Sequence, residues 1–338
     1  MSTLFTQLPA TPDTVQPDPS KHVKYTLGML LGVDDLNQEF AYLSGRDQWL
    51  ARDAVGYGTL SGLKVSQDKT AQGPRLTVSA GTALSPRGEL ICMRPVQCAM
   101  LNDWLTSNQA KLKPMGGSPP GSILSLWLVI CYRNCPVDPV PIAGEPCRSA
   151  DDLMAPSRLV DDFLLELRLA PPLQEEEDAV RDFVSLMDQV QIADVGPFIS
   201  LADFEKALRV ALSPGASPLT PDTFFIFGSP LNAARIPSAD VGKYLQSAFR
   251  IWTTEIRPLF HALPGTGGCS CGDTTSPTPP VNDCCLLLAE IDVPVIKVGP
   301  NWQVDDKNPV IIDESRRPIL LHTRMLQQWL LSGLSAKT

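Results

Sequence analysis

Proline is the residue that most constrains what this chain can fold into. The 338 residues include 32 prolines, nearly twice the average share of about 5%. A proline ring fixes φ and removes a backbone donor, so proline is excluded from helix interiors and from the middle of sheets. The prolines gather in an N-terminal arm and in residues 114–120, 136–156 and 264–280. We therefore expect the helices and strands to lie between these segments.

The segments between the proline clusters contain both strand and helix periodicity. Residues 34–54 predict a helix, because apolar side chains recur along one stripe (Leu36, Phe40, Leu43 and Leu50). Glycine-punctuated, β-prone pieces follow over 56–93. The apolar run 122–133 and the alternating run 161–169 predict two strands, with the proline-rich segment 135–156 as an excursion between them.

The second half of the chain predicts three helices, a strand and a last helix. Glu175, Ser200 and Ser238 each precede an apolar stripe with helical spacing. Strand character returns over 284–298. The last helix is predicted from Glu314 to Leu331, with Pro318 in its first turn.

These patterns predict an α+β fold. We expect a small glycine-rich antiparallel β module and a β-sheet domain that carries a helical insertion and a C-terminal helix. The expected parts are an N-terminal arm (1–21), a helix plus the β module (22–115), the sheet domain with the C-terminal helix (116–172 and 283–338), the helical insertion (173–262) and a Cys/Gly/Pro-rich loop (263–282).

Charge and hydropathy exclude two classes of partner. The formal net charge of −9 argues against nucleic acid, whose binding depends on clustered Lys and Arg. The longest apolar run covers about ten residues, whereas a membrane span needs about twenty, so no direct membrane span is expected. The N-terminal residues show no secretory signal, which predicts a cytoplasmic location and disfavours disulfides.

The nine cysteines leave three alternatives open. Their odd number argues against complete pairing. A Cys-x-Cys pair lies within the 263–282 loop and a Cys-Cys pair follows it, which permits a structural zinc site, because zinc prefers four thiolate or imidazole ligands. Disulfides and unpaired thiols are the other two readings. The candidate zinc ligands are Cys135, Cys147, Cys269, Cys271, Cys284 and Cys285.

Catalytic motifs are absent from the sequence. We find no phosphate loop, dinucleotide-binding glycine fingerprint, His-Glu-x-x-His pair or nucleophile elbow. The three histidines have ordinary structural explanations, since a triad also needs positioned partners. We therefore assign no catalytic residue and expect the protein not to be an enzyme.

Several short segments carry a family resemblance. Residues 58–65 (GTLSGLKV), 76–83 (LTVSAGTA) and 87–91 (RGELI) resemble a glycine-punctuated β module of phage-tail and baseplate proteins. Residues 285–291 (CLLLAEI), 310–313 (VIID) and 316–318 (RRP) are similar to a strand-and-Arg pattern near the ends of tail-fibre-like proteins. Residues 42–47 (YLSGRD) and 154–158 (MAPSR) add to the overall resemblance. As a whole, the chain resembles a baseplate-associated component of bacterial contractile injection systems.

This resemblance implies assembly rather than chemistry. It implies a homo-oligomer, with a trimer suspected, that docks to other baseplate, tube or sheath proteins. The particle would assemble in the cytoplasm and then be either membrane-anchored or released. The C-terminal helix carries a broad apolar band, which suggests that a neighbouring chain covers part of it. The interface residues that we expect there are Ile319, Leu326, Trp329 and Leu330.

Two other functions remain open at this point. One is a metal- or thiol-dependent enzyme that uses Cys269, Cys271 and Cys285. The other is a carbohydrate- or surface-binding fibre module, for which Trp302 in a turn is the one tryptophan free to contact a ligand. If the chain is an assembly protein, we expect docking at a face built from the two proline-rich excursions and their neighbouring cysteines.

Overall fold

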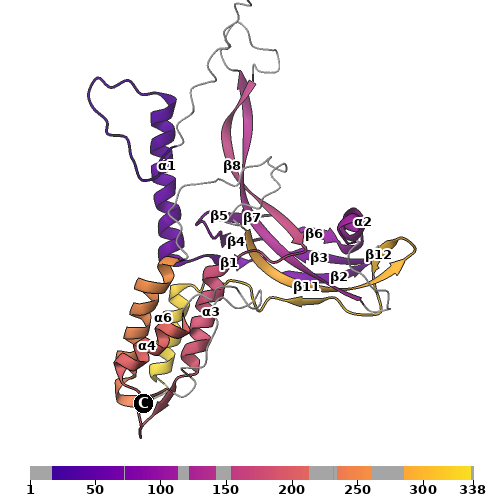
Figure 1. Cartoon of the computed structure of the whole chain (residues 1–338). Helices are drawn as coiled ribbons and strands as arrows, with labels where there is room; N and C mark the ends of the chain where they lie inside the picture. The colour runs from indigo at the N-terminus through magenta and orange to yellow at the C-terminus, as the bar shows by residue number, and fades with distance from the viewer. Residues whose placement is uncertain are drawn as a thin grey trace, which may run out of the picture. The chain divides into compact units, whose positions relative to one another are not determined.

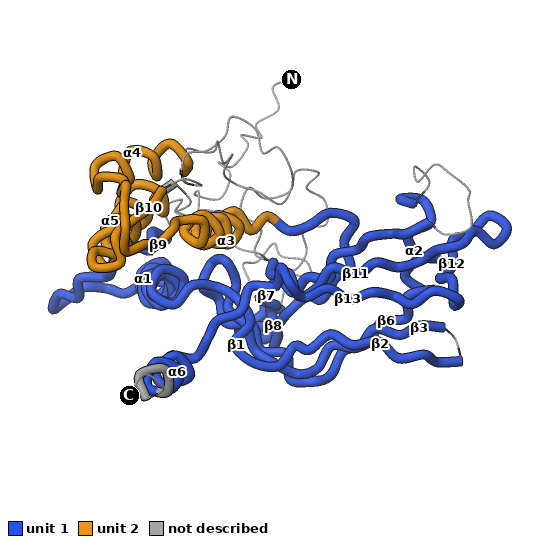
Figure 2. Tube along the Cα trace, turned by 90° about the horizontal axis from the view of Figure 1, so that it is seen from below, with its two compact units in different colours: residues 1–172, 264–338 blue, residues 173–263 orange. Residues whose placement is uncertain are grey.

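The fold is α+β, as predicted. The computed structural model describes residues 17–71, 73–112, 122–141, 154–212, 231, 234–259 and 285–335. The chain divides into two compact units, one formed by Met1–Pro172 with Pro264–Thr338 and the other by Leu173–Leu263 (Figure 2). The second unit is the helical insertion that the sequence predicts.

An antiparallel sheet of order β12-β11-β7-β8 organises the first unit, and β13 also pairs with β11 (Figure 1). Strand β11 pairs with β7 over ten residue pairs, although the two strands are far apart in the sequence. The strands are β7 (Ser122–Pro141), β8 (Met154–Arg168), β11 (Cys285–Val298), β12 (Asn301–Val304) and β13 (Ile311–Asp313).

Alternation along β7 and β11 decides which side chains enter the main core. Even-numbered residues of β7 from Leu124 to Ile130 are buried in this core, as a strand with two-residue periodicity requires. Strand β11 changes phase at a bulge between Leu287 and Ala289. Residues before and after the bulge therefore reach the same core, from Leu286 to Val295.

The proline-rich segment between β7 and β8 is partly strand, which corrects the predicted excursion over 135–156. Strand β7 continues to Pro141 and β8 begins at Met154, so the two form a long ribbon. The register is the same for the Val137–Arg158 and Pro139–Pro156 pairs, on either side of Asp138, whose φ is 54°. A ribbon of two strands tolerates proline because outward-facing backbone positions need no donor.

The glycine-rich segment forms the predicted antiparallel module as two small sheets. One has the order β1-β4-β5 and the other the order β2-β3-β6. Helix α2 (Leu101–Leu112) follows, and its buried leucines join the same core as β7 and β11. The module strands are β1 (Gly58–Gly62), β2 (Val65–Thr70), β3 (Gly73–Val78), β4 (Gly81–Leu84), β5 (Leu90–Met93) and β6 (Gln97–Met100).

The helix predicted over 34–54 is confirmed as α1 (Val33–Leu50), which continues as a π turn over Ala51–Val55. The turn that contains Gly88 lies against the backbone of Gln48, so closely that a Cβ at Gly88 would overlap it. Helix α1 is thus anchored to the β module at its C-terminal end. None of its own residues is buried.

The insertion is a helical unit with its own core. Its main helices are α3 (Glu175–Asp188), α4 (Leu201–Ala211) and α5 (Val241–Ile251). Helices α3 and α4 begin where the sequence predicts, whereas Ser238 starts a 3-10 turn and α5 begins three residues later. Two short strands, β9 (Gln191–Ala193) and β10 (Arg235–Pro237), pair in parallel. The Ser200 side chain caps α4 by accepting the backbone N–H of Asp203. Phe183, Phe204 and Leu208 are among the side chains that fill the core.

The C-terminal helix begins later than predicted. Helix α6 covers Thr323–Ser335, whereas we expected a helix from Glu314 with Pro318 in its first turn. The segment before it lies along β1 instead, where Ile319 forms a parallel bridge with Thr59. The Thr59 N–H donates to the Pro318 carbonyl over 2.9 Å, and the Leu320 N–H donates to the Thr59 carbonyl over 3.0 Å.

Arg317 explains why this segment is extended rather than helical. Its side chain is buried, with 6% of its surface exposed, and burial lowers its pKa. The guanidinium donates to the Thr59 hydroxyl over 2.9 Å and to the Gly62 carbonyl over 3.2 Å, and it pairs with Glu314. A Cβ at Gly58 would lie only 2.9 Å from the Pro318 carbonyl, so a glycine there permits this close approach. We call this contact the Arg317 clamp.

We predict that Arg317→Ala destabilises the protein by about 2–4 kcal/mol, because it leaves the Gly62 carbonyl and the Thr59 hydroxyl without their buried donor. Urea unfolding of the full chain measures this change. Arg94→Ala, at an exposed arginine beside the same module, is the matched control and should change stability by less than about 0.5 kcal/mol. Equal effects of the two substitutions would contradict the clamp.

Candidate functional site

The structure places two of the six candidate zinc ligands, and both are disulfide-bonded. Cys285 is bonded to Cys131, and Cys135 is also in a disulfide. Since a disulfide sulfur offers no thiolate to a metal, neither residue acts as a zinc ligand in this state. Cys147, Cys269, Cys271 and Cys284 lie outside the described residues. Among the residues that are described, no group of three or more His, Cys, Asp or Glu could hold a metal ion.

The Cys131–Cys285 disulfide corrects our expectation that disulfides are disfavoured. Antiparallel register puts the two residues directly opposite each other on β7 and β11, with their Cα atoms 4.0 Å apart. Their side chains point to the face opposite the main core, where Val129 and Leu287 are also buried. The sequence analysis placed each cysteine on a strand but could not see that the strands pair in this register.

Arg168 lies against this disulfide. Its Nη2 is 3.0 Å from Sγ of Cys285 and 3.5 Å from Sγ of Cys131. The Nε of the same guanidinium donates to Glu166 over 3.0 Å. The arginine therefore links the end of β8 to the junction of β7 and β11. Cys285 is thus not a free thiol, so the structure does not support the thiol-enzyme alternative at this residue.

We predict that the disulfide stabilises the first unit, because it joins residues 154 positions apart. The variant Cys131→Ala/Cys285→Ala should be about 2–4 kcal/mol less stable in urea than the parent. Cys92→Ala/Cys98→Ala is the matched control, since both of these cysteines are free and exposed. Peptide mapping without reductant should recover Cys131 and Cys285 in one linked species. Recovery of both as alkylated single peptides would show the assignment to be wrong.

The four expected interface residues lie at the C-terminal end of the described chain and are all exposed. Leu326, Trp329 and Leu330 lie on α6 with 40–72% of their surface exposed, whereas Ile319 lies on the extended segment before it. Met325 and Leu331 widen the same apolar surface. No other described helix or strand packs extensively against α6. The broad apolar band is therefore real and is not filled by a groove of the described chain.

Helix α1 presents a second exposed apolar surface, which the sequence analysis did not identify as an interface. The stripe that predicted this helix is the surface itself: Leu36, Phe40, Leu43 and Leu50 are each more than half exposed. No other described helix or strand packs extensively along α1. The pattern was visible in the sequence, but a stripe of this kind normally faces the protein's own core.

Trp302, the candidate ligand contact of a fibre module, is in the main core. Only 8% of its surface is exposed. Its backbone N–H donates to Gln109 over 3.0 Å, which fixes β12 against α2. The exposed-tryptophan argument for carbohydrate binding is therefore wrong at this residue.

Polar side chains of the β module and of the ribbon lie close enough to influence one another's pKa. The Ser85 hydroxyl donates to the buried carboxylate of Glu89 over 2.7 Å. The Tyr132 hydroxyl on β7 donates to Asp161 on β8 over 2.7 Å. Burial raises the pKa of Glu89, and nearby Asp161 raises it further. Burial, together with the hydrogen bond to Asp161, also raises the pKa of Tyr132. These contacts stabilise the 85–89 turn and the ribbon.

The raised pKa of Glu89 predicts a pH-dependent stability. The folded state retains a proton on Glu89 at pH values where the unfolded chain has lost it, so stability falls as the pH rises from the ordinary value of 4.5 through the raised one. Glu89→Gln should therefore be more stable than the parent at pH 8, and this advantage should vanish near pH 4. Melting temperatures across this pH range test the prediction.

Asp313→Asn is a control for which we expect the opposite change of stability with pH. Hydrogen bonds from Ser315 lower the pKa of Asp313, so this carboxylate contributes stability above its unfolded pKa that is lost as the pH falls. The asparagine variant should be less stable than the parent at pH 8 and should approach it in acid. A Glu89→Gln profile parallel to that of the parent would contradict the assignment.

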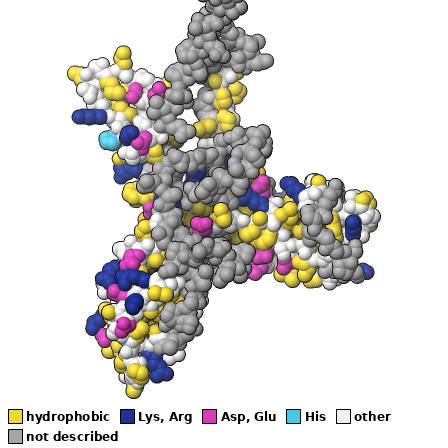
Figure 3. Space-filling view, viewed as in Figure 1, with side chains coloured by type: hydrophobic (Ala, Val, Ile, Leu, Met, Phe, Trp, Pro, Cys, Tyr) yellow, Lys and Arg dark blue, Asp and Glu magenta, His cyan; other side chains and the backbone are white. Residues whose placement is uncertain are grey.

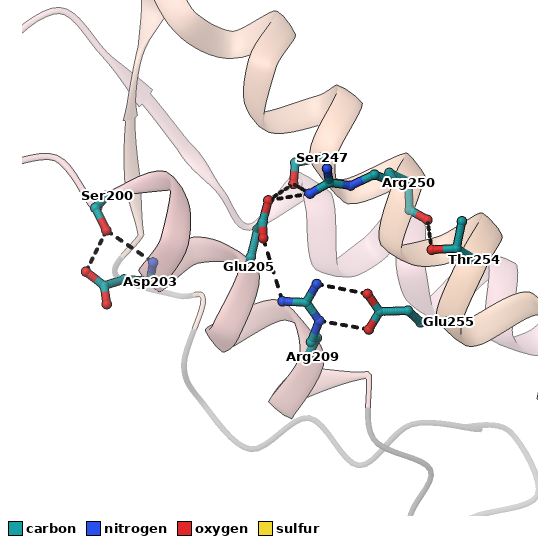
Figure 4. A network of polar contacts seen from close by, with 8 residues as sticks. All are labelled: Ser200, Asp203, Glu205, Arg209, Ser247, Arg250, Thr254 and Glu255. Atoms are coloured by element: carbon teal, nitrogen blue, oxygen red, sulfur yellow. Dashed lines mark hydrogen bonds and ion pairs between the residues drawn. The ribbon is translucent and has the colours of Figure 1, made fainter.

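The largest ion-pair network lies within the insertion and has a structural explanation (Figure 4). Arg209 on α4 makes two 2.8 Å hydrogen bonds to Glu255, in the π turn after α5. Glu205 accepts from Ser247 and from Arg250, with the Arg250 contact at 2.7 Å. The hydrogen bond from Ser247 and the nearby arginines lower the pKa of Glu205. The network holds α4 against α5, and at this exposure each pair contributes little.

Charge on the surface is mixed. In Figure 3, the Lys and Arg side chains of the described residues lie interspersed with Asp and Glu side chains on the face shown. The exclusion of nucleic acid rests on net charge and remains a prediction. Among the described residues, no helix has both the length and the apolar character needed to cross a bilayer.

Comparison with known proteins adds no family. No family model matches the chain, and no curated protein is similar enough to count as a relative. The argument for function therefore rests on the residues and surfaces described above.

Proposed function

We propose that this chain is a structural, non-enzymatic subunit of a contractile, phage-tail-like injection particle, docked at or around its baseplate. The observation that carries the proposal is the exposed apolar surface of α6, with Leu326 and Leu330 as its central residues. Monomeric soluble proteins rarely leave a contiguous apolar patch of more than a few hundred Å² in water. A surface of this kind therefore favours a protein that works by being covered in an assembly.

The framework behind α6 suits a docking role. The Arg317 clamp ties the segment before the helix to β1, so the helix leaves the β module from a fixed point. The clamp involves residues 58–62 and 316–318, which are two of the segments that resemble tail and baseplate proteins. We infer that this contact explains why both segments carry the resemblance. The first segment supplies the hydrogen-bond acceptors, Thr59 and Gly62, and the second supplies the donor, Arg317.

The partners that we propose are other baseplate, tube or sheath proteins, together with further copies of this chain, with a trimer as the suspected oligomer. Assembly would take place in the cytoplasm, before any anchoring or release of the particle. Binding of α6 in this setting would come from apolar burial, at about 25 cal/mol per Å² of surface removed from water. No covalent chemistry is needed for such a role.

We predict that the tagged full chain, expressed in its own host, co-sediments with sheath and tube proteins as part of one particle. Leu330→Asp should reduce the co-sedimenting fraction about tenfold or more, because a carboxylate cannot be buried in an apolar interface without a partner. Gln327→Asp is the matched control, since Gln327 is an exposed polar residue of the same helix.

The readout is the fraction of the tagged chain that sediments with the particle, with circular dichroism of each variant confirming a retained fold. Absence of the parent chain from sedimenting particles would remove the proposed function. Equal sedimentation of the two variants would remove α6 as the docking surface.

A further inference from the structure

Helix α1 carries an apolar seam with the spacing of a coiled coil. The seam consists of Val33, Leu36, Phe40, Leu43, Asp47 and Leu50. Successive members are separated by three and four residues in strict alternation, which keeps them on one narrow stripe of the helix. Five of the six are large apolar residues, and these five are 53–73% exposed. The stripe therefore has the form of a helix-pairing seam that no described helix or strand covers.

The other side of α1 is already occupied by the chain itself. Gln38 exchanges hydrogen bonds with the backbone of Asp18, at 3.0 and 2.6 Å. Tyr42 contacts the ring of His22, with centroids 5.0 Å apart, and Gly45 lies against Pro19. Figure 1 shows this N-terminal segment as a loop running beside the helix. The described part of this segment, from residue 17 onward, thus covers the polar side of α1 and leaves the seam uncovered.

We propose that the α1 seam pairs with the same seam of a second copy of this chain, in antiparallel orientation. The spacings along the seam are 3, 4, 3, 4 and 3, so they read identically in both directions. An antiparallel pair therefore brings all six positions into register. Phe40 then faces Leu43 of the second copy, and Val33 faces Leu50 of the second copy.

Charge decides between antiparallel and parallel pairing. In a parallel pair in register, Asp47 would face Asp47 of the second copy inside the seam, and like charges at such a position are destabilising. In the antiparallel pair, Asp47 faces Leu36 of the second copy, so the two carboxylates are separated. The antiparallel arrangement removes this repulsion.

The residues flanking the seam favour the same arrangement. Glu39 and Arg46 lie on one flank, seven residues apart. In the antiparallel register, Glu39 of each copy lies beside Arg46 of the other, which gives two ion pairs related by the two-fold axis. In the parallel register, the same two residues face Ser44 and Ala51 of the other copy and gain no ion pair. Charge complementarity thus points to a second copy as the occupant.

The inference goes beyond the proposed function and does not depend on it. A two-fold pairing through α1 requires an even-numbered assembly, whatever α6 binds: a dimer of the isolated chain, or a hexamer where the suspected trimer also forms. An α1 helix of 18 residues is about 27 Å long. A contact confined to one pair of helices of this length is small, so we expect a reversible dimer with a Kd on the order of micromolar.

Sedimentation equilibrium of the full chain from about 1 to 100 μM tests the pairing at the concentrations that such an affinity requires. We expect a monomer–dimer equilibrium. Phe40→Glu should weaken it about 100-fold, because each dimer gains two carboxylates within apolar layers. Trp49→Glu is the matched control, because it replaces an exposed aromatic residue away from the seam and should change the affinity less than about twofold.

Charge exchange tests the orientation. Glu39→Arg should weaken the dimer about tenfold, since both ion pairs become repulsive, and the double variant Glu39→Arg/Arg46→Glu should restore most of the affinity. Only the antiparallel register pairs these two positions, so failure of the double variant to recover would overturn the orientation.

Three further results would overturn the pairing as a whole. A monomer at every concentration would do so, as would a trimer as the only oligomer. Association that Phe40→Glu leaves unchanged, but that Leu330→Asp abolishes, would assign the contact between copies to α6. The proposed function is tested separately, because its co-sedimentation experiment uses α6 variants expressed in the host.

Discussion

The pairing of β7 with β11 is the interaction on which the rest of the structure depends. These strands lie on either side of the whole insertion in the sequence, yet they form ten residue pairs in one antiparallel ladder. Their ladder closes the first unit around a core shared with the β module and α2. The Cys131–Cys285 disulfide then fixes the same ladder covalently on its other face. This pairing brings the segments before and after the insertion into one core.

The Arg317 clamp extends this closure to the surface. A buried guanidinium satisfied by Thr59, Gly62 and Glu314 holds the chain beside β1, at the start of the β module. The chain after α1 leads directly into this strand, and the segment before α6 runs beside it. Gly56 lies against Leu320, and Thr59 forms a bridge with Ile319. The two helices with exposed apolar faces are therefore both anchored beside β1. Both exposed apolar faces are therefore attached to the same part of the β module.

Function is accordingly more readily explained by surfaces than by a reactive centre. The candidate functional residues that the sequence singled out and the structure describes have structural explanations: Cys135 and Cys285 are in disulfides, and Trp302 lies in the main core. The exposed faces of α1 and α6 have no comparable explanation within the described chain. Since apolar surface of this extent is costly in water, association is the simplest physical reason for it.

The sequence by itself determined the local elements and the fold class. Periodicity placed α1 and the insertion helices within a few residues, because apolar spacing and the cap at Ser200 act locally. It also identified the residues of the α1 and α6 apolar stripes. Prolines were a weaker guide, since Pro136 and Pro139 lie in the β7–β8 ribbon that proline content alone would exclude.

Only the tertiary structure decided which faces are buried and which long-range contacts form. Helix α6 starts at Thr323 rather than at Glu314, because the hydrogen bonds of Arg317 to buried acceptors on β1 stabilise an extended segment there. The cysteine pairing depended on a register between strands 154 residues apart, which no local spacing encodes. Whether an apolar stripe faces its own core or a partner depends on what the rest of the chain places beside it. That is a property of packing, and it made α1 and α6 surfaces instead of core.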